Sequence, residues 1–332
     1  APILKHITDI EHAVAMRNFL SNFYTTIKSL DTHLDFIFLT GVTKFSKTSI
    51  FSGMNNLRDI SFSEDYAAIC GYTQQELETD FSEHIAVQAA RMEQPRAELL
   101  ESLRFWYNGY RFSTAPIKVY NPFSILLFFT EKRFANYWFA TGTPTFLVTL
   151  IKKEFVEFER IEGTEVTGDD FNAFEIGSPP LLPLLYQTGY ITIGAYKPAT
   201  DSFSFTYPNE EVRRSLSVSL TAAMLSADDI KANALFVQLR SAIMTQKPND
   251  FCKGIQSVLS SIPYHIHMPK EAYYHSILHI IGMGIGSAES EVATSKGRID
   301  LVLHSATAEY IIELKFNKPA QEALSQIKDR RY

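Results

Sequence analysis

Apolar residues at the start of the chain follow first a helical and then a strand-like spacing. They recur at helical intervals over residues 10–30, which predicts an amphipathic helix. Residues 34–42, LDFIFLTGV, form a short continuous apolar run, typical of a buried strand in a parallel sheet. Asn55 and Asn56 then predict a turn. The first 60 residues therefore indicate a helix, a strand and a loop.

Residues 61–225 have the pattern of a mostly helical region with a small β wing. Thr73 and Glu76 match a capping box and predict a helix start. The Asn-Gly pair at 108–109 lies between aromatic residues and predicts a tight hairpin. Near Gly189 a helical pattern ends and a strand pattern begins, and a second strand leads into another helix. Helices followed by a hairpin favour a winged-helix-like layout.

Residues 226–332 predict a separate unit in which three strands lie between helices. The expected elements are, in order, helices at 228–246, at 249–261 and from Pro269 to the glycines at 282–286, strands near Glu291, at 299–303 and at 310–316, and a helix at 319–331.

Three charges interrupt the last two apolar runs. Asp300 lies inside the first run, and Glu313 and Lys315 lie inside the second. If the hairpin turns between Ala306 and Thr307, residue 300 faces residue 313, and facing Cβ atoms lie roughly 4.5–5.5 Å apart. We therefore expect two carboxylates and one ammonium group at one place.

Two adjacent carboxylates repel each other unless a cation lies between them. Mg²⁺ suits a small set of oxygen ligands and keeps waters for a substrate phosphate, and Mn²⁺ is a close substitute. Such a site is competent for phosphodiester hydrolysis, with the lysine stabilising developing charge. The alternative is a solvated strand face, with Asp300 at the start of a strand.

The composition narrows the class of protein. The chain has 332 residues, 45% of them hydrophobic and 20% charged, with a net charge of −6. This excludes a strongly basic nucleic-acid-binding chain but not a local basic patch. Two distant cysteines, no signal peptide and no apolar run of about 18 residues favour a cytoplasmic protein without a membrane span. Both ends have the pattern of cuts through a longer protein.

The stretch GRIDLVL…YIIELKF resembles the PD-(D/E)XK nuclease superfamily, in which a metal-binding Asp precedes Glu-x-Lys on the next strand. Ile299 stands where that family has proline. The resemblance implies an acidic ligand on the first helix, which matches Glu271, and a glutamine on the last helix, which matches Gln326. Glu291 competes with Glu271 for the acidic role.

The wider chain resembles a bacterial family that joins an AAA-ATPase-like region to such a nuclease domain. The resemblance rests on FLTGVTKFSKTSIFSGMNNLRDIS, CGYTQQEL, YNGYRF and VYNPFSILLFF. It implies an α/β multidomain fold, with a partial P-loop AAA-like core at 1–60, a helical and winged-helix-like region at 61–225, and a restriction-endonuclease-like αβ sandwich at 226–332, truncated at its C-terminus.

Nucleotide binding by this chain is not expected. Residues 41–48, GVTKFSKT, nearly match a P-loop, but Ser46 replaces the second glycine, whose backbone wraps the phosphates. The family resemblance places the P-loop before residue 1, so ATP is expected only in an intact protein. A nucleotide hydrolase built on residues 41–48 is the less favoured alternative.

Four histidines form a second candidate group. His275 and His279 share one helix face, as two zinc ligands do, but without an HExxH motif burial explains them better. His275 lies four residues after Glu271 and is expected to line the same cleft without binding metal. The other two are His265 and His267.

Taken together, the residues and the resemblance predict a Mg²⁺- or Mn²⁺-dependent nuclease. Asp300, Glu313 and Glu271 hold the ion, Lys315 supports the transition state, and Gln326 positions the substrate or the lysine. The expected partner is nucleic acid, with DNA favoured over RNA. The alternative is a regulatory module that binds nucleic acid or protein through a degenerate nuclease domain without cutting.

Overall fold

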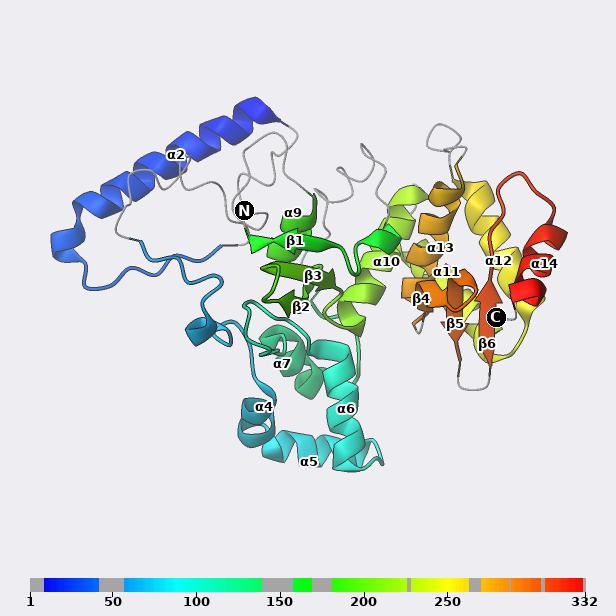
Figure 1. The fold of residues 1–332 in the computed structure, drawn as a ribbon. Helices are drawn as coiled ribbons and strands as arrows, with labels where there is room; N and C mark the ends of the chain where they lie inside the picture. Colours follow the sequence, from blue (N-terminus) through cyan, green and yellow to red (C-terminus); the bar gives the residue numbers. More distant parts are fainter. Residues whose placement is uncertain are drawn as a thin grey trace. The chain divides into compact units, whose positions relative to one another are not determined.

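The structure is a computed structural model (Figure 1). It describes residues 9–41, 57–138, 158–168, 181–225, 228–262, 270–286, 288–305 and 308–330. Contacts divide the chain into two compact units, the first formed by Ala1–Arg133 with Gly163–Asn209 and the second by Phe134–Glu162 with Glu210–Tyr332.

The first unit contains helices and a small antiparallel sheet whose strand order is β1-β3-β2. Its helices are α2 (Ile10–Ser29), α4 (Gln74–Asp80), α5 (Ser82–Arg91), α6 (Arg96–Tyr107), α7 (Pro122–Glu131) and α9 (Leu181–Gln187), with 3-10 turns at Asp31–His33 and Glu64–Tyr66. Its strands are β1 (Glu165–Thr167), β2 (Thr192–Lys197) and β3 (Ser202–Thr206).

The helix start at Thr73 is confirmed as a complete capping box. The Thr73 hydroxyl accepts from the Glu76 N–H at 3.2 Å, and the Glu76 carboxylate accepts from the Thr73 N–H at 2.8 Å. Each side chain thus satisfies a backbone donor that the first helical turn leaves free. This local signal needs no partner from elsewhere in the chain.

The hairpin predicted at Asn108 and Gly109 is wrong. Helix α6 ends at Tyr107, Asn108 caps it, and the Asn108 side chain accepts from the Gly109 N–H at 2.7 Å. Gly109 has φ +119, and a Cβ there would lie 1.9 Å from the carbonyl oxygen of Pro208. Glycine is required by this close approach of two backbones, and not by a two-residue turn.

The strand predicted at residues 34–42 is also wrong over its described part. Residues 34–41 form no strand, and Phe36 and Phe38 are 80% and 55% exposed. A strand needs a neighbour to satisfy its N–H and C=O groups, and both sheets in the described residues consist of other segments. The turn expected at Asn55 and Asn56 lies outside the described residues, as do residues 42–48.

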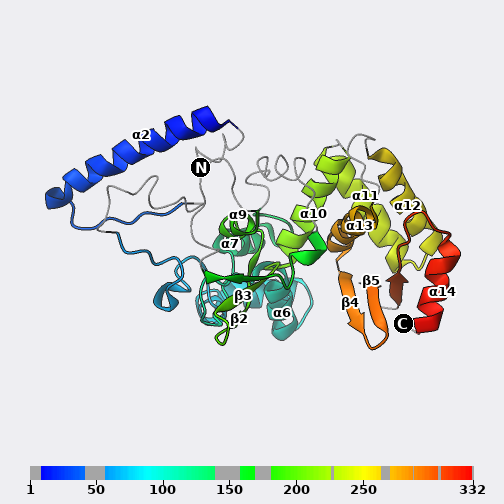
Figure 2. The ribbon, with the colours of Figure 1, turned by 45° about the horizontal axis from the view of Figure 1, so that its top comes forward.

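The second unit gathers helices beside a sheet of order β4-β5-β6, as Figures 1 and 2 show. It comprises a 3-10 turn at Phe158–Arg160, helices α10 (Glu210–Met224), α11 (Asp229–Met244), α12 (Pro248–Ser261) and α13 (Glu271–Ile285), strands β4 (Ala288–Thr294), β5 (Gly297–His304) and β6 (Glu309–Ile312), and helix α14 (Ala320–Arg330). The predicted order of helix, three strands and helix is confirmed. The three-part division of the chain remains a prediction.

Helix α13 packs closely against the sheet of the second unit. Leu301 and Leu303 of β5 are 2% and 0% exposed and join the same core as residues of α11 and α13. Gly282 lies inside α13, where a Cβ would come within 2.9 Å of the Ala288 side chain and 3.2 Å of Leu301. The glycines at 282–286 were expected to end this helix, but only Gly286 caps it, whereas Gly282 provides room for the sheet.

Candidate functional site

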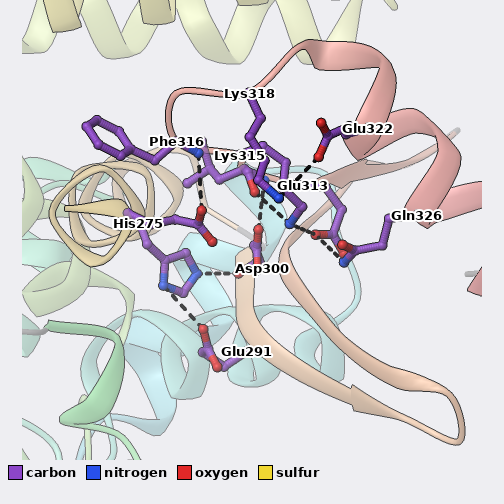
Figure 3. Close-up of polar contacts among 11 residues, drawn as sticks. His275, Glu291, Asp300, Glu313, Lys315, Phe316, Lys318, Glu322 and Gln326 are labelled. Carbon is purple, nitrogen blue, oxygen red and sulfur yellow. Dashed lines mark hydrogen bonds and ion pairs between the residues drawn. The ribbon is translucent and has the colours of Figure 1, made fainter. Parts of the chain in front are cut away.

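The hairpin of β5 and β6 brings the predicted acidic residues together. Leu301 pairs with Ile312 and His304 pairs with Glu309, so the predicted turn centre between residues 306 and 307 is confirmed. The strand predicted at 310–316 is shorter than expected: β6 ends at Ile312, so Glu313 and Lys315 follow the strand and do not lie inside it. The two segments of the hairpin stay in contact beyond that point, because the Leu314 N–H donates to Asp300 Oδ2 at 2.7 Å. Asp300 and Glu313 consequently lie next to each other (Figure 3).

Glu313 is a buried carboxylate whose charge is incompletely compensated. Its side chain is 0% exposed, and Oε1 has no hydrogen-bond partner among the described residues. Burial and the neighbouring charge of Asp300 raise the pKa of Glu313. An unpaired buried carboxylate oxygen beside a second carboxylate is an arrangement that a cation stabilises.

Lys315 and Gln326 contact the same carboxylate from two directions. The Gln326 amide on α14 donates to Glu313 Oε2 at 2.8 Å. The Lys315 ammonium lies 3.6 Å from that oxygen and donates to the Leu314 carbonyl at 2.9 Å. Both predicted residues therefore lie at the site, and both leave Glu313 Oε1 open.

Glu271 lies in the first turn of α13 and contacts the loop after β6. Its Oε2 accepts from the Phe316 N–H at 3.1 Å. The ring of Tyr274, on the same helix, stacks on Phe316 with centroids 5.5 Å apart. These contacts join the start of α13 to the segment that carries Glu313. The role of Glu271 as a metal ligand remains a prediction.

His275 and Glu291 form the part of the site that the sequence indicated only in fragments. His275 Nε2 lies 2.9 Å from the Asp300 carbonyl oxygen, and Nδ1 lies 3.2 Å from Glu291 Oε1. Arg298 forms an ion pair with the other Glu291 oxygen. One ligand atom from each of His275, Glu291 and Asp300 lies within 4.8 Å of the others. Helical spacing from Glu271 placed His275 at the cleft, but no sequence signal paired it with Glu291.

His279, one turn after His275, has a different partner. Its Nδ1 lies 2.6 Å from the Ser290 hydroxyl of β4, and its side chain is buried, with a relative exposure of 6%. The two histidines therefore hold different points of the sheet, which agrees with the structural reading of the pair. His265 and His267 lie outside the described residues.

Two family models match the ends of the chain. Residues 1–51 match the family described as "Predicted AAA-ATPase", and residues 269–332 match the PD-(D/E)XK nuclease superfamily. The second match contains Glu271, Asp300, Glu313, Lys315 and Gln326.

A protein of Azotobacter chroococcum mcd 1, described as "Uncharacterized protein in vnfD 5'region", is 37% identical to this chain over 346 residues. The alignment covers 100% of the chain and 64% of that relative, so the chain spans less than two thirds of its length. No solved structure matches the chain.

The described helices include none that combines the length and the apolar character needed to span a membrane. Asp300 and Glu313 both lie in the segment that matches the nuclease superfamily. The chain therefore combines an N-terminal segment that matches a predicted AAA-ATPase family with a C-terminal segment that matches the PD-(D/E)XK nuclease superfamily.

Proposed function

We propose that the C-terminal domain hydrolyses phosphodiester bonds in nucleic acid with the aid of Mg²⁺ or Mn²⁺. Asp300 and Glu313 hold the ion, and Glu271 assists. The observation that carries the proposal is the buried Glu313 side chain, which leaves Oε1 without a partner beside a second carboxylate. A solvated strand face, the alternative reading of these charges, would not bury that carboxylate.

The residues at this place fit a hard divalent cation. Carboxylate oxygens are the ligands that Mg²⁺ and Mn²⁺ prefer, and a cation between Asp300 and Glu313 removes their mutual repulsion. When bound, such an ion polarises a phosphoryl oxygen and lowers the pKa of a water molecule.

The surrounding side chains prepare the two carboxylates. Gln326 donates to Glu313 Oε2, and Oε1 is left without a hydrogen-bond partner among the described residues. Lys315 adds a positive charge 3.6 Å from the same carboxylate, where it stabilises negative charge that develops on a phosphate. Glu271 holds the Phe316 N–H and thereby fixes the loop that follows the acidic pair.

The proposed substrate is DNA, and the superfamily match supports nucleic acid more generally. In a longer protein that carries a P-loop, we propose that ATP hydrolysis by the AAA-like region is coupled to this cleavage. The match of residues 1–51 to a predicted AAA-ATPase family supports the presence of an AAA-like region, on which this proposed coupling depends.

The proposal is tested by cleavage of a panel of single-stranded and duplex DNA and RNA with Mg²⁺ or Mn²⁺. We expect Asp300→Asn and Glu313→Gln to lower the rate by more than about 100-fold, because a lost ligand costs at least as much as the 10- to 100-fold typical of a residue that only supports one. The matched control is Glu309→Gln, at the exposed end of the same hairpin, where Glu309 lies 3.2 Å from His304.

Equal rates in the wild type and both site variants would remove these residues from the mechanism. Binding of Mn²⁺ that Glu313→Gln abolishes, without cleavage of any substrate in the panel, would favour the non-cleaving regulatory module instead.

A further inference from the structure

The ladder between β4 and β5 is interrupted beside Asp300. Ser290 pairs with Leu301 and Val292 pairs with Ile299, and the register skips the pair of Glu291 with Asp300. Glu291 has φ +57, a left-handed conformation that ordinary strand residues avoid. The backbone of Asp300 therefore lies opposite the point where its neighbouring strand is irregular.

His275 contacts the backbone at this interruption. Its Nε2 lies 2.9 Å from the Asp300 carbonyl oxygen, which can only accept, so Nε2 is the donor. The residue is 7% exposed, so its ring is fixed by packing as well as by its polar contacts. A buried ring that donates to a backbone carbonyl restrains the position of that carbonyl and of the side chain on the same residue.

Glu291 and Arg298 hold the other side of the imidazole. Glu291 Oε1 lies 3.2 Å from Nδ1, and Arg298 forms an ion pair with the second oxygen of the same carboxylate. Figure 3 shows His275 between Glu291 and the Asp300 backbone. Arg298 of β5 thus contacts Glu291 of β4, and Glu291 contacts His275 of α13. His275 in turn contacts the backbone of Asp300, which lies again on β5.

We propose that His275 is a positioning residue for the divalent-ion site, acting through the backbone of Asp300 and oriented by Glu291. This inference rests on the proposed function, because it assumes that Asp300 holds the ion. Asp300 is held at two points: the Leu314 N–H donates to its carboxylate at Oδ2, and His275 donates to its backbone carbonyl. Arg298, paired with Glu291, places a positive charge at this end of the chain of contacts, which favours an orienting role over a second cation site.

Two amide variants separate the two contacts of the ring. In His275→Gln the amide nitrogen lies near the position of Nε2, so the contact with Asp300 is kept and the contact with Glu291 is lost. In His275→Asn the amide nitrogen lies near the position of Nδ1, so the contact with Asp300 is lost. The pair therefore tests which nitrogen matters, at similar polarity and burial.

The measurement is the Mn²⁺ dissociation constant of the full chain by calorimetry, which requires no cleavage. We expect His275→Asn to weaken Mn²⁺ binding by about 10- to 100-fold, the usual effect of losing a group that supports a metal ligand. We expect His275→Gln to bind Mn²⁺ at least about 3-fold more tightly than His275→Asn does. The melting temperatures of the two variants should be similar, so a general loss of packing would not separate their affinities.

His279→Asn and His279→Gln are the matched controls, because His279 is equally buried on the same helix and contacts Ser290 instead of Asp300. Both should bind Mn²⁺ as the wild type does. Glu291→Ala provides a second route if His275→Asn does not fold, and should weaken Mn²⁺ binding to a smaller extent than the asparagine variant.

Three results would overturn this inference and leave the proposed function intact. Each requires that the wild type binds Mn²⁺ and that Glu313→Gln abolishes this binding. The first is a Mn²⁺ affinity equal to that of the wild type in His275→Asn or Glu291→Ala. The second is an equal loss of Mn²⁺ affinity in His275→Gln and His275→Asn. The third is a histidine nitrogen coupling in the pulsed electron paramagnetic resonance spectrum of bound Mn²⁺. The last result would make His275 a ligand. A wild type without any Mn²⁺ site sensitive to Glu313→Gln would overturn the proposed function as well.

Discussion

Two apolar runs of the chain have similar patterns and different structures. Residues 34–41 are rich in Leu, Ile and Phe, yet they form no strand and expose Phe36 and Phe38. Residues 299–303 carry a charge at Asp300, yet they form the central strand of a sheet and bury Leu301 and Leu303. Each run carries one aspartate, Asp35 in the first and Asp300 in the second, so the apolar pattern alone does not explain which run is a buried strand.

The difference between the runs lies in their neighbours. Strand β5 has β4 on one side and β6 on the other, and α13 packs against it. Residues 34–41 have no strand beside them in the described part of the chain. Because backbone groups must be paired to be buried, an apolar run becomes a core strand only where other segments supply hydrogen bonds and a packing face.

The largest expected effect tests this comparison directly. Leu303→Ala removes a fully buried side chain and should lower the free energy of unfolding by about 2–5 kcal/mol. Phe38→Ala removes a larger side chain that is 55% exposed and should change it by less than about 0.5 kcal/mol. Urea denaturation of both variants measures the difference, and comparable losses would show that residue 38 is buried in solution.

A second prediction concerns the two carboxylates of the proposed metal site, Asp300 on β5 and Glu313 directly after β6. Mn²⁺ at about 100 times its dissociation constant should stabilise the wild type by about 2.7 kcal/mol, because the ion binds the folded state. Glu313→Gln should lose that stabilisation, and Glu309→Gln should keep it. Thermal denaturation with and without Mn²⁺ measures both. A Mn²⁺ shift retained in Glu313→Gln would place the ion elsewhere.

The same variant has an expected pH dependence without the ion. Burial and Asp300 raise the pKa of Glu313 in the folded state, so its contribution to stability is fully present below the unfolded value of about 4.3. That contribution is lost as the pH rises through the raised folded value. Glu313→Gln cannot ionise, so its stability relative to the wild type should increase over this pH window. If the difference in stability between Glu313→Gln and the wild type did not change with pH, the folded structure would not raise the pKa of Glu313.

The smallest expected effect belongs to a purely local feature. Thr73→Ala breaks the capping box of α4 and should lower the free energy of unfolding by about 1 kcal/mol at pH 7. The Thr73 N–H and hydroxyl lower the pKa of Glu76, so this stabilisation is present above the unfolded pKa of Glu76 and is lost as the pH falls through the folded value.

The control for the cap is Thr25→Ala, in the exposed middle of α2, where a threonine hydroxyl bonds the Ser21 carbonyl and caps nothing. It should be neutral or slightly stabilising, since alanine has the higher helix propensity. If Thr73→Ala behaved in the same way, the capping box would not contribute to stability.

The parts of the fold that were predicted correctly depend on neighbours close in sequence. The capping box at Thr73 and Glu76 spans four residues, and the β5–β6 register follows from one short turn. That register also placed Asp300 beside Glu313. Pairing within one hairpin is therefore sufficient to predict that Asp300 and Glu313 lie next to each other.

The parts that were missed depend on contacts between distant segments. The role of Gly109 is set by Pro208, about a hundred residues later, so the Asn-Gly pair was read as a turn. The contact between His275 and Glu291 requires α13 and β4 to meet at an irregular position of the strand. Neither partner could be inferred from the spacing of residues along one segment.

Gly282 has no side chain, and this determines how closely α13 approaches the sheet that carries Asp300. This residue allows α13 to lie directly against Ala288 and Leu301, and α13 also carries Glu271 and His275. Adding one methyl group there would push the helix outward and pull both polar residues away from the acidic pair, although the glycine itself touches none of them. The spacing of the proposed metal site therefore depends on packing in the core of the domain, at a residue outside the site.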